Sequence, residues 1–179
     1  MSELTVGTLS GLAANSYVID VASGSSLDLS NGATLPAGSI VQVVQAETST
    51  AAAITATSPQ DIGLSATITP SSASNKILVM TSVYVDSRRA STQTSAMLEI
   101  QRDASSIFLD GGDGSIFMNA ATASSLVILA TRINVDYLDS PATTSSVTYN
   151  LRGRVGVGGT AEFQKNSNKS FLTLMEVVA

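Results

Sequence analysis

Residues 62–86 read Ile62-Gly-Leu-Ser-Ala-Thr-Ile-Thr-Pro-Ser-Ser-Ala-Ser-Asn-Lys-Ile-Leu-Val-Met-Thr-Ser-Val-Tyr-Val-Asp86. Apolar and small polar residues alternate up to the Ser/Pro/Asn cluster, and a run rich in β-branched residues follows it. Alternation with period two is typical of a strand with one buried face, whereas Pro, Ser and Asn are turn residues. The stretch therefore predicts two strands joined by a turn, and it indicates an all-β fold.

Strand patterns continue along the chain from residue 39. They cover residues 40–44, 95–102, 107–109, 116–118, 126–133, 145–157 and 171–178. The segments 107–109 and 116–118 flank Asp110-Gly-Gly-Asp113-Gly, which predicts a hairpin loop. About eight or nine strands separated by turns predict a jelly-roll-like β-sandwich over residues 39–179.

Residues 1–38 differ from the rest because short apolar pieces are cut by Gly, Ser and Asn. Asn31-Gly32 is a strong turn signal, and no helical periodicity is present. We predict an extended N-terminal arm of short strands that anchors the sandwich or joins it to other copies. The alternative interpretation is a loosely ordered tail.

Composition limits the chemistry that this chain can perform. Hydrophobic residues make up 44% of it and charged residues only 13%, whereas about 25% charged residues is usual in soluble domains. There is no Cys, so disulfides and thiolate metal sites are excluded. There is also no His, which removes the commonest general base and the commonest metal ligand. We predict no catalytic, cofactor or metal site, and hence no enzyme.

Charge is distributed unevenly along the chain. Residues 1–75 contain no Lys or Arg, and the first basic residue is Lys76. Nucleic-acid binding requires a basic patch, and none is visible. No apolar run approaches the roughly 20 residues of a membrane helix. We therefore expect neither nucleic-acid binding nor membrane insertion.

Three strands, at 76–84, 126–130 and 171–178, are apolar on both faces. One face of each sheet in a two-layer sandwich meets solvent, so a doubly apolar strand predicts that its outer face is covered. We expect a homo-oligomer, most simply a homotrimer around an axis; the alternative is a locally thick core or covering loops. The predicted interface residues are Ile77, Val79, Leu126, Ile128, Leu172 and Leu174.

Two groups of carboxylates are candidates for reactive sites. Asp110 and Asp113 offer oxygens to Ca²⁺, but they lack the spaced ligands and closing Glu of an EF-hand, which favours a hairpin loop. Asp136 and Asp139 form a candidate carboxylate pair, but Asp139-Ser-Pro141 is more simply a turn initiator.

Charged residues in loops are candidates for contact with a partner. Arg88 and Arg89 are predicted to lie in a loop after a strand, and Asp110 and Asp113 in the hairpin loop. The alternative for each is a solvated loop charge. Arg152 and Arg154 are predicted on the polar face of a strand, where they meet carboxylates across an interface or form an ordinary surface.

Several segments together resemble a module of structural proteins from marine tailed bacteriophages. The first two are Ala37-Gly-Ser-Ile-Val-Gln-Val-Val-Gln45 and residues 61–79, which include the opening stretch. Residues 137–149, 171–177 and 4–11 are similar to other segments of the same family. The similar segments are spread over most of the chain, and none of them is a catalytic motif.

This resemblance implies a trimeric β-structured appendage on the outer surface of a phage particle, without enzymatic activity. A capsid decoration protein or head fibre fits best, with the major capsid protein as a partner. The alternative is a tail fibre tip, whose loops at 86–94, 110–114 and 119–125 contact a host receptor. A third candidate is a carboxylate-dependent hydrolase or lyase for host polysaccharide.

Overall fold

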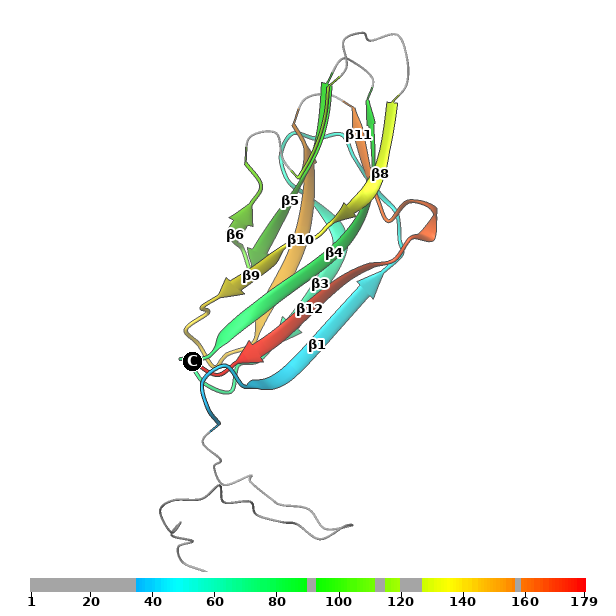
Figure 1. Ribbon diagram of the computed structural model, residues 1–179. Helices are drawn as coiled ribbons and strands as arrows, with labels where there is room; N and C mark the ends of the chain where they lie inside the picture. The colour runs from blue at the N-terminus through cyan, green and yellow to red at the C-terminus, as the bar shows by residue number, and fades with distance from the viewer. Residues whose placement is uncertain (1–34, 90–92, 112–114, 120–126, 157–158) are drawn as a thin grey trace, which may run out of the picture. The chain divides into compact units, whose positions relative to one another are not determined.

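The computed structural model describes residues 35–89, 93–111, 115–119, 127–156 and 159–179. Two antiparallel β-sheets lie face to face in the unit Leu35–Ala179 (Figure 1), which confirms the predicted all-β sandwich. Its strands are β1 (Ile40–Thr48), β2 (Ala52–Ile54), β3 (Gln60–Ile68), β4 (Lys76–Arg89), β5 (Gln93–Arg102), β6 (Ser105–Leu109), β7 (Ile116–Asn119), β8 (Val127–Ile133), β9 (Asp136–Asp139), β10 (Val147–Val155), β11 (Thr160–Phe163) and β12 (Ser170–Val177). A 3₁₀ turn, Lys165–Ser167, separates β11 from β12.

The first sheet is organised around β4, a strand of 14 residues. Its first half pairs with β12 and β9, and its second half with β11 and β8. β1 and β2 extend the sheet beyond β12 and β11. The break between β8 and β9 is closed by Thr81, whose backbone N donates to the Val135 carbonyl and whose Oγ1 accepts from the Val135 N.

The second sheet has the order β3-β10-β5, with β6 and β7 placed one after the other along the free edge of β5. The sequence predicted that the segments of β6 and β7 would pair with each other as a hairpin, and this prediction is wrong. Both strands instead use β5 as their partner, because β5 is long enough to pair with β7 at one end and β6 at the other.

The chain order of the strands is that of a jelly roll. When β1/β2, β6/β7, β8/β9 and β11/β12 are each counted as one interrupted row, eight rows result. The first row pairs with the eighth, the second with the seventh, the third with the sixth and the fourth with the fifth. The chain is thus one long hairpin wrapped into two sheets. Its tip is the turn at Asp103, whose φ of 52° is a left-handed conformation that Asp tolerates.

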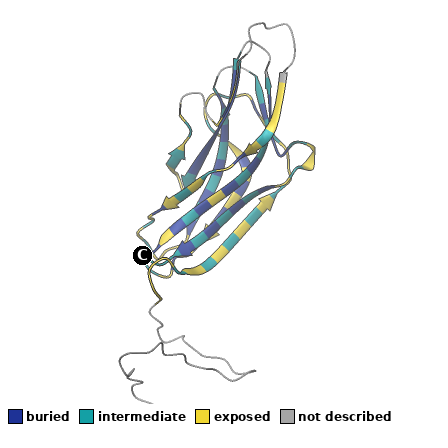
Figure 2. Ribbon diagram, in the orientation of Figure 1, coloured by how far each residue is buried: buried dark blue, intermediate teal, exposed yellow. Residues whose placement is uncertain are grey.

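The core lies between the two sheets (Figure 2). Every residue of the predicted apolar face of β10 lies in this core, since Val147, Tyr149, Leu151 and Val155 are all buried. Gly153 continues this face, and its missing side chain leaves room for the ring of Phe163 from β11. Strict period-two burial in β3, β10 and β12 confirms the predicted strand type of these segments.

Some observed strands were not predicted, and some predicted strands lie in residues that the structure does not describe. The sequence pattern did not predict β2, β9 and β11, which have only three or four residues each. The short strands predicted within residues 1–34 lie outside the described residues. No helix in the described part of the chain is long and apolar enough to cross a membrane.

Candidate functional site

Four of the predicted interface residues point into the core of the subunit and not toward its surface. Ile77 and Val79 of β4, with Leu172 and Leu174 of β12, are fully buried between the two sheets. A side chain without exposed surface in one subunit cannot contact another subunit, so this prediction is corrected. Ile128 does lie on the surface, with 47% exposure, and Leu126 lies outside the described residues.

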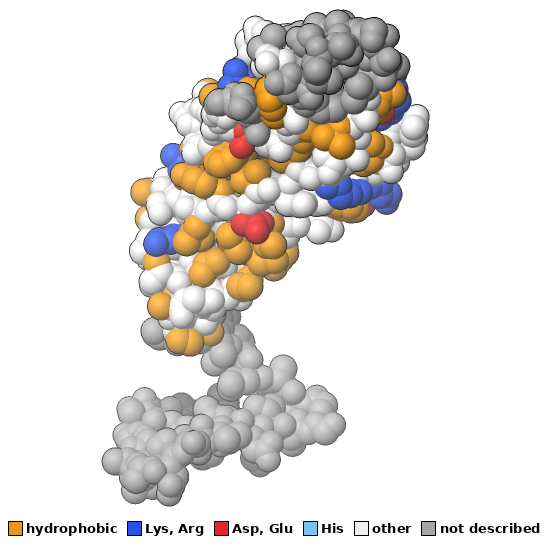
Figure 3. Space-filling view, turned by 45° about the horizontal axis from the view of Figure 1, so that its top comes forward, with side chains coloured by type: hydrophobic (Ala, Val, Ile, Leu, Met, Phe, Trp, Pro, Cys, Tyr) orange, Lys and Arg blue, Asp and Glu red, His pale blue; other side chains and the backbone are white. Residues whose placement is uncertain are grey.

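The residues next to these four form the outer face of the first sheet. Strand register aligns Val43, Met175, Leu78 and Leu138 in one row across β1, β12, β4 and β9. Val43 is 56% exposed and Leu138 is 49% exposed, while the two central residues are partly covered. Figure 3 shows hydrophobic side chains gathered in patches on this face. We call this set of four residues the apolar row.

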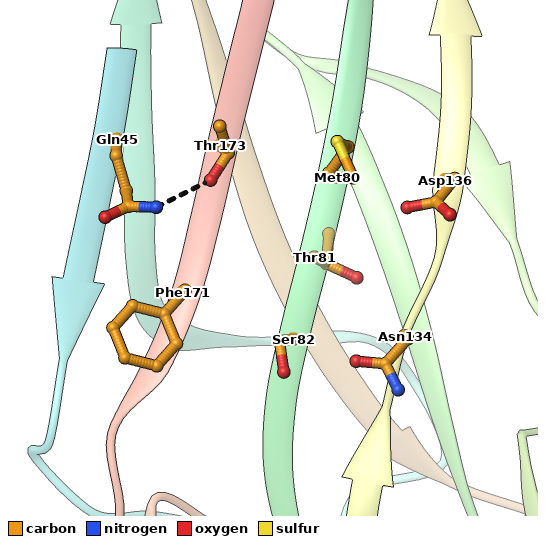
Figure 4. Close-up of a pocket in the computed structure, with 8 residues that line it drawn as sticks. All are labelled: Gln45, Met80, Thr81, Ser82, Asn134, Asp136, Phe171 and Thr173. Atoms are coloured by element: carbon orange, nitrogen blue, oxygen red, sulfur yellow. Dashed lines mark hydrogen bonds between the residues drawn. The ribbon is translucent and has the colours of Figure 1, made fainter. Parts of the chain in front are cut away.

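A shallow hollow of about 440 Å³ lies beside the apolar row (Figure 4). The next row of the sheet forms its floor, with Gln45, Thr173, Met80 and Asp136 in register. Gln45 donates from Nε2 to Thr173 Oγ1 at 2.9 Å. The carboxylate of Asp136 is exposed, and within the described part of the chain it has no hydrogen bond or ion pair.

Phe171 closes one end of the hollow. The guanidinium of Arg132 lies 6.0 Å from the centre of its ring, within the range of a cation–π contact. Arg132 also donates to the carbonyls of Ser82 and Lys169. These contacts fix Arg132 beside the ring of Phe171. The hollow is therefore lined mostly by polar groups, with one aromatic ring at its end.

The outer face of the second sheet is polar over β3 and β10 and provides an internal comparison. Ser65, Asn150 and Gln101 are aligned across β3, β10 and β5. In the neighbouring row, Thr67 and Thr148 join their hydroxyls at 2.8 Å. An outer face that meets solvent is expected to be polar. Over β3 and β10 the second sheet therefore keeps the pattern of a solvated face, although Leu109 of β6 and Phe117 of β7 are exposed along the edge beyond β5.

Glu176 of β12 lies on the inner side of the first sheet and is fully buried. Its Oε1 accepts from Ser71 N, Ser71 Oγ and Asn75 Nδ2, and its Oε2 accepts from Gln42 Nε2, each at 2.7 Å. Burial opposes the charged form, but these hydrogen bonds outweigh it, so the pKa of Glu176 is lowered. The carboxylate ties β1 and the β3–β4 turn to β12.

Asp139 is the centre of a second buried cluster. Arg102 Nη1 lies 2.8 Å from its Oδ2, and the Tyr149 hydroxyl donates to the same oxygen at 2.7 Å. The hydrogen bond to Asp139 raises the pKa of Arg102. Asp136 and Asp139 do not form the candidate carboxylate pair, because Asp136 is exposed on the outer face while Asp139 is buried, as alternation along β9 requires.

Arg88 is corrected from a loop residue to a strand residue. It lies in β4, where its Nε contacts Asp86 Oδ1 at 3.1 Å and its Nη2 contacts Glu162 Oε2 at 3.1 Å. Lys165 also contacts both carboxylates. Arg89 ends the same strand. Two cations and two anions thus satisfy one another on the outer face, which leaves Arg88 without a free charge for a partner.

The remaining candidates also have contacts within the subunit. Asp110 Oδ2 accepts from Leu98 N at 3.1 Å and from Ser115 Oγ, so its carboxylate is bound within the subunit; Asp113 lies outside the described residues. Arg152 contacts Glu99 Oε2 at 3.3 Å, and Arg154 Nη2 donates to the Asp110 carbonyl. Among the described residues, no group of three or more acidic side chains is placed to hold a metal ion.

Comparisons with known proteins leave the family open. No protein-family model matches the chain, and no curated protein matches it. The residues that sequence reasoning missed are Leu138, Met175 and those that line the hollow. The apolar character of Leu138 and Met175 was visible in the sequence, but the face to which each of these residues belongs depends on strand register.

Proposed function

We propose that this chain is a non-enzymatic structural protein of a tailed-phage particle, most simply a homotrimeric capsid decoration protein. The proposal starts from the resemblance of five segments to phage structural modules. It places the protein on the outer surface of the particle, where it contacts the major capsid protein. Neither a cofactor nor a metal ion takes part in this function.

The observation that carries the proposal is the meeting of these separate segments in buried clusters. Gln42 comes from the first segment, Ser71 and Asn75 from the second, and Glu176 from the last, and all four meet at one carboxylate. The sequence similarity of these segments to the phage modules is thus accounted for by contacts that hold the strands together. This favours a likeness of framework, which is what a structural module requires.

The two ends of the sandwich support an anchored module. Gly38 and Ser39 pair with Val178, so the segment that follows residue 34 and the chain's last residues lie at one end. β4 ends and β5 begins at the other end, where β8 and β11 also begin. The first end suits attachment through the N-terminal arm, and the second suits exposure to the surroundings.

Labelled antibodies against the recombinant protein, applied to intact purified particles, test the proposal. We expect label over the capsid and hundreds of copies in each particle by quantitative mass spectrometry. Absence of the protein from purified particles would overturn the proposal. A phage with the gene deleted serves as the control for antibody specificity.

A tail fibre tip is the second candidate, favoured by the strand ends gathered at one end of the sandwich. At this end Arg88 of β4 pairs with Thr160 of β11 and with Ile128 of β8, so the ends of these three strands lie side by side. Binding sites commonly use loops that a rigid scaffold presents together. Label at the tail, a few copies per particle and binding of the pure protein to host cells would favour this candidate over decoration.

A further inference from the structure

We propose that the outer face of the first sheet is the interface between copies of this chain, with the apolar row at its centre. The inference deepens the proposed function, because it rests on the homotrimer and names the surface that forms it. The occupant of the face is a second copy of the chain.

The first argument is the contrast between the two outer faces of one sandwich. Val43 and Leu138 are exposed at the two ends of the apolar row, and Met80 is exposed beside it. Over β3 and β10 the outer face of the second sheet carries Ser65, Thr67 and other polar side chains, while Leu109 and Phe117 are exposed along the edge beyond β5. Burying apolar surface releases roughly 25 cal/mol for each Å². The outer face of the first sheet therefore gains more from being covered than the polar surface over β3 and β10 does.

The second argument is the size of the face. The face is four strands wide when β8 and β9 are counted as one. With strands about 4.8 Å apart and a rise of about 3.3 Å per residue, four strands of about nine residues span roughly 19 by 30 Å. That is a projected area of roughly 570 Å², and side chains add to it. A specific interface buries about 800 Å² on each partner. The flat area of one sheet face is thus just below the low end of the range for such interfaces, about 600 Å² on each partner, before the surface of the side chains is counted.

The third argument is charge, and it selects the occupant. Lys76 and Asp136 both lie on this face, and within the described residues neither has a hydrogen bond or an ion pair. A second copy brings both signs and can supply a partner for each. The chain's own residues 1–34 contain Glu3, Asp20 and Asp28 but no Lys or Arg. That segment offers no basic side chain to Asp136, so it matches the charges of the face less well.

The test measures the mass of the full-length protein by sedimentation velocity over a range of concentrations. We expect the wild type at three times 18.3 kDa. Val43→Glu and Leu138→Glu place a charge in the interface, and each is expected to raise the dissociation concentration by roughly 100-fold or more. Ser65→Glu is the matched control, since Ser65 is exposed on the edge strand of the second sheet. It is expected to keep the wild-type mass.

Oxidation by hydroxyl radicals provides a second readout. Met80 and Met175 lie on the proposed interface, so both are expected to oxidise several-fold more slowly in the wild type than in Val43→Glu. Met97 is buried within the subunit and serves as the internal reference. Circular dichroism establishes that each variant is folded; if Val43→Glu is unfolded, Leu138→Glu decides the question.

Each other outcome overturns a different statement. If the wild type is an oligomer and both Glu variants keep its mass, the interface lies elsewhere while the trimer stands. A monomeric wild type with slowly oxidised Met80 and Met175 would mean that the chain's own residues cover the face. A monomer with freely oxidised Met80 and Met175 would overturn both the interface and the trimer. The phage assignment stands or falls separately, by antibody label on the particles.

Discussion

Asn75 Nδ2 donates a 2.7 Å hydrogen bond to Glu176 Oε1 across 101 residues of chain. The two residues belong to the turn before β4 and to the last strand. Glu176 is buried and forms no ion pair with any described residue, and its charge is satisfied there by amide and hydroxyl donors. Such a carboxylate is a strong structural tie, since removing it leaves several donors without an acceptor.

Replacing Glu176 by Gln is expected to lower the free energy of unfolding by about 1–3 kcal/mol. The amide of Gln brings its own N–H groups toward Gln42 and Asn75, which are themselves donors. Urea denaturation measures the change. Glu47→Gln is the matched control, because Glu47 is an exposed carboxylate paired with Lys169 on the edge strand of the same sheet. A change within about 0.5 kcal/mol is expected there, and equal losses in both variants would contradict the role of Glu176.

The stability contributed by Glu176 is expected to depend on pH. Its pKa is lowered in the folded protein from an ordinary value of 4.5. The contribution is therefore fully present above pH 4.5 and is lost as the pH falls through the lower folded value. The difference in unfolding free energy between the wild type and Glu176→Gln should shrink as the pH is lowered below 4.5. A difference that stays constant between pH 7 and the acid limit of folding would refute this expectation.

Replacing Tyr149 by Phe tests the second buried cluster. The variant loses the 2.7 Å hydrogen bond to Asp139, and we expect its free energy of unfolding to be about 1–2 kcal/mol lower than that of the wild type. Burial raises the pKa of Tyr149 above its ordinary value of 10.0, and Asp139 raises it further. Folding thus favours the neutral phenol, and the stability from this group falls as the pH rises toward the folded value.

Absorbance titration supplies the matching observation for Tyr149. The folded wild type and Tyr149→Phe should give superimposable phenolate signals up to pH 10, because Tyr149 remains neutral there. An additional phenolate signal in the folded wild type below pH 10 would show that this hydroxyl is accessible to solvent. The same titration in urea should show the signal of the additional tyrosine in the wild type.

Gly153 is expected to be intolerant of any side chain. A Cβ at this position meets the ring of Phe163, which has no free space in the core. Gly153→Ala is expected to lower the free energy of unfolding by about 1–3 kcal/mol through overpacking. Gly111→Ala is the control, since a Cβ there meets nothing within 4 Å. Thermal unfolding of both variants measures the difference, and equal melting temperatures would contradict the close packing.

The fold class follows from the sequence because alternation is local. In β10, Tyr149 and Leu151 face the core while Asn150 and Arg152 face outward, and each residue can be assigned from its neighbours alone. The turn residues between the strands are equally local. The sequence alone thus indicated an all-β sandwich, although the short strands β2, β9 and β11 were not predicted.

The direction in which β4 and β12 face was decided only by the tertiary structure. Both faces of these strands are apolar, so the sequence offers no contrast between Val79 and Leu78, or between Leu174 and Met175. A shift of one residue exchanges the two faces, and only pairing across the sheet determines the register. The cluster at Glu176 likewise needs three distant segments to meet. Alternation therefore determined the strands, while long-range pairing decided which of their side chains form the core and which form the surface.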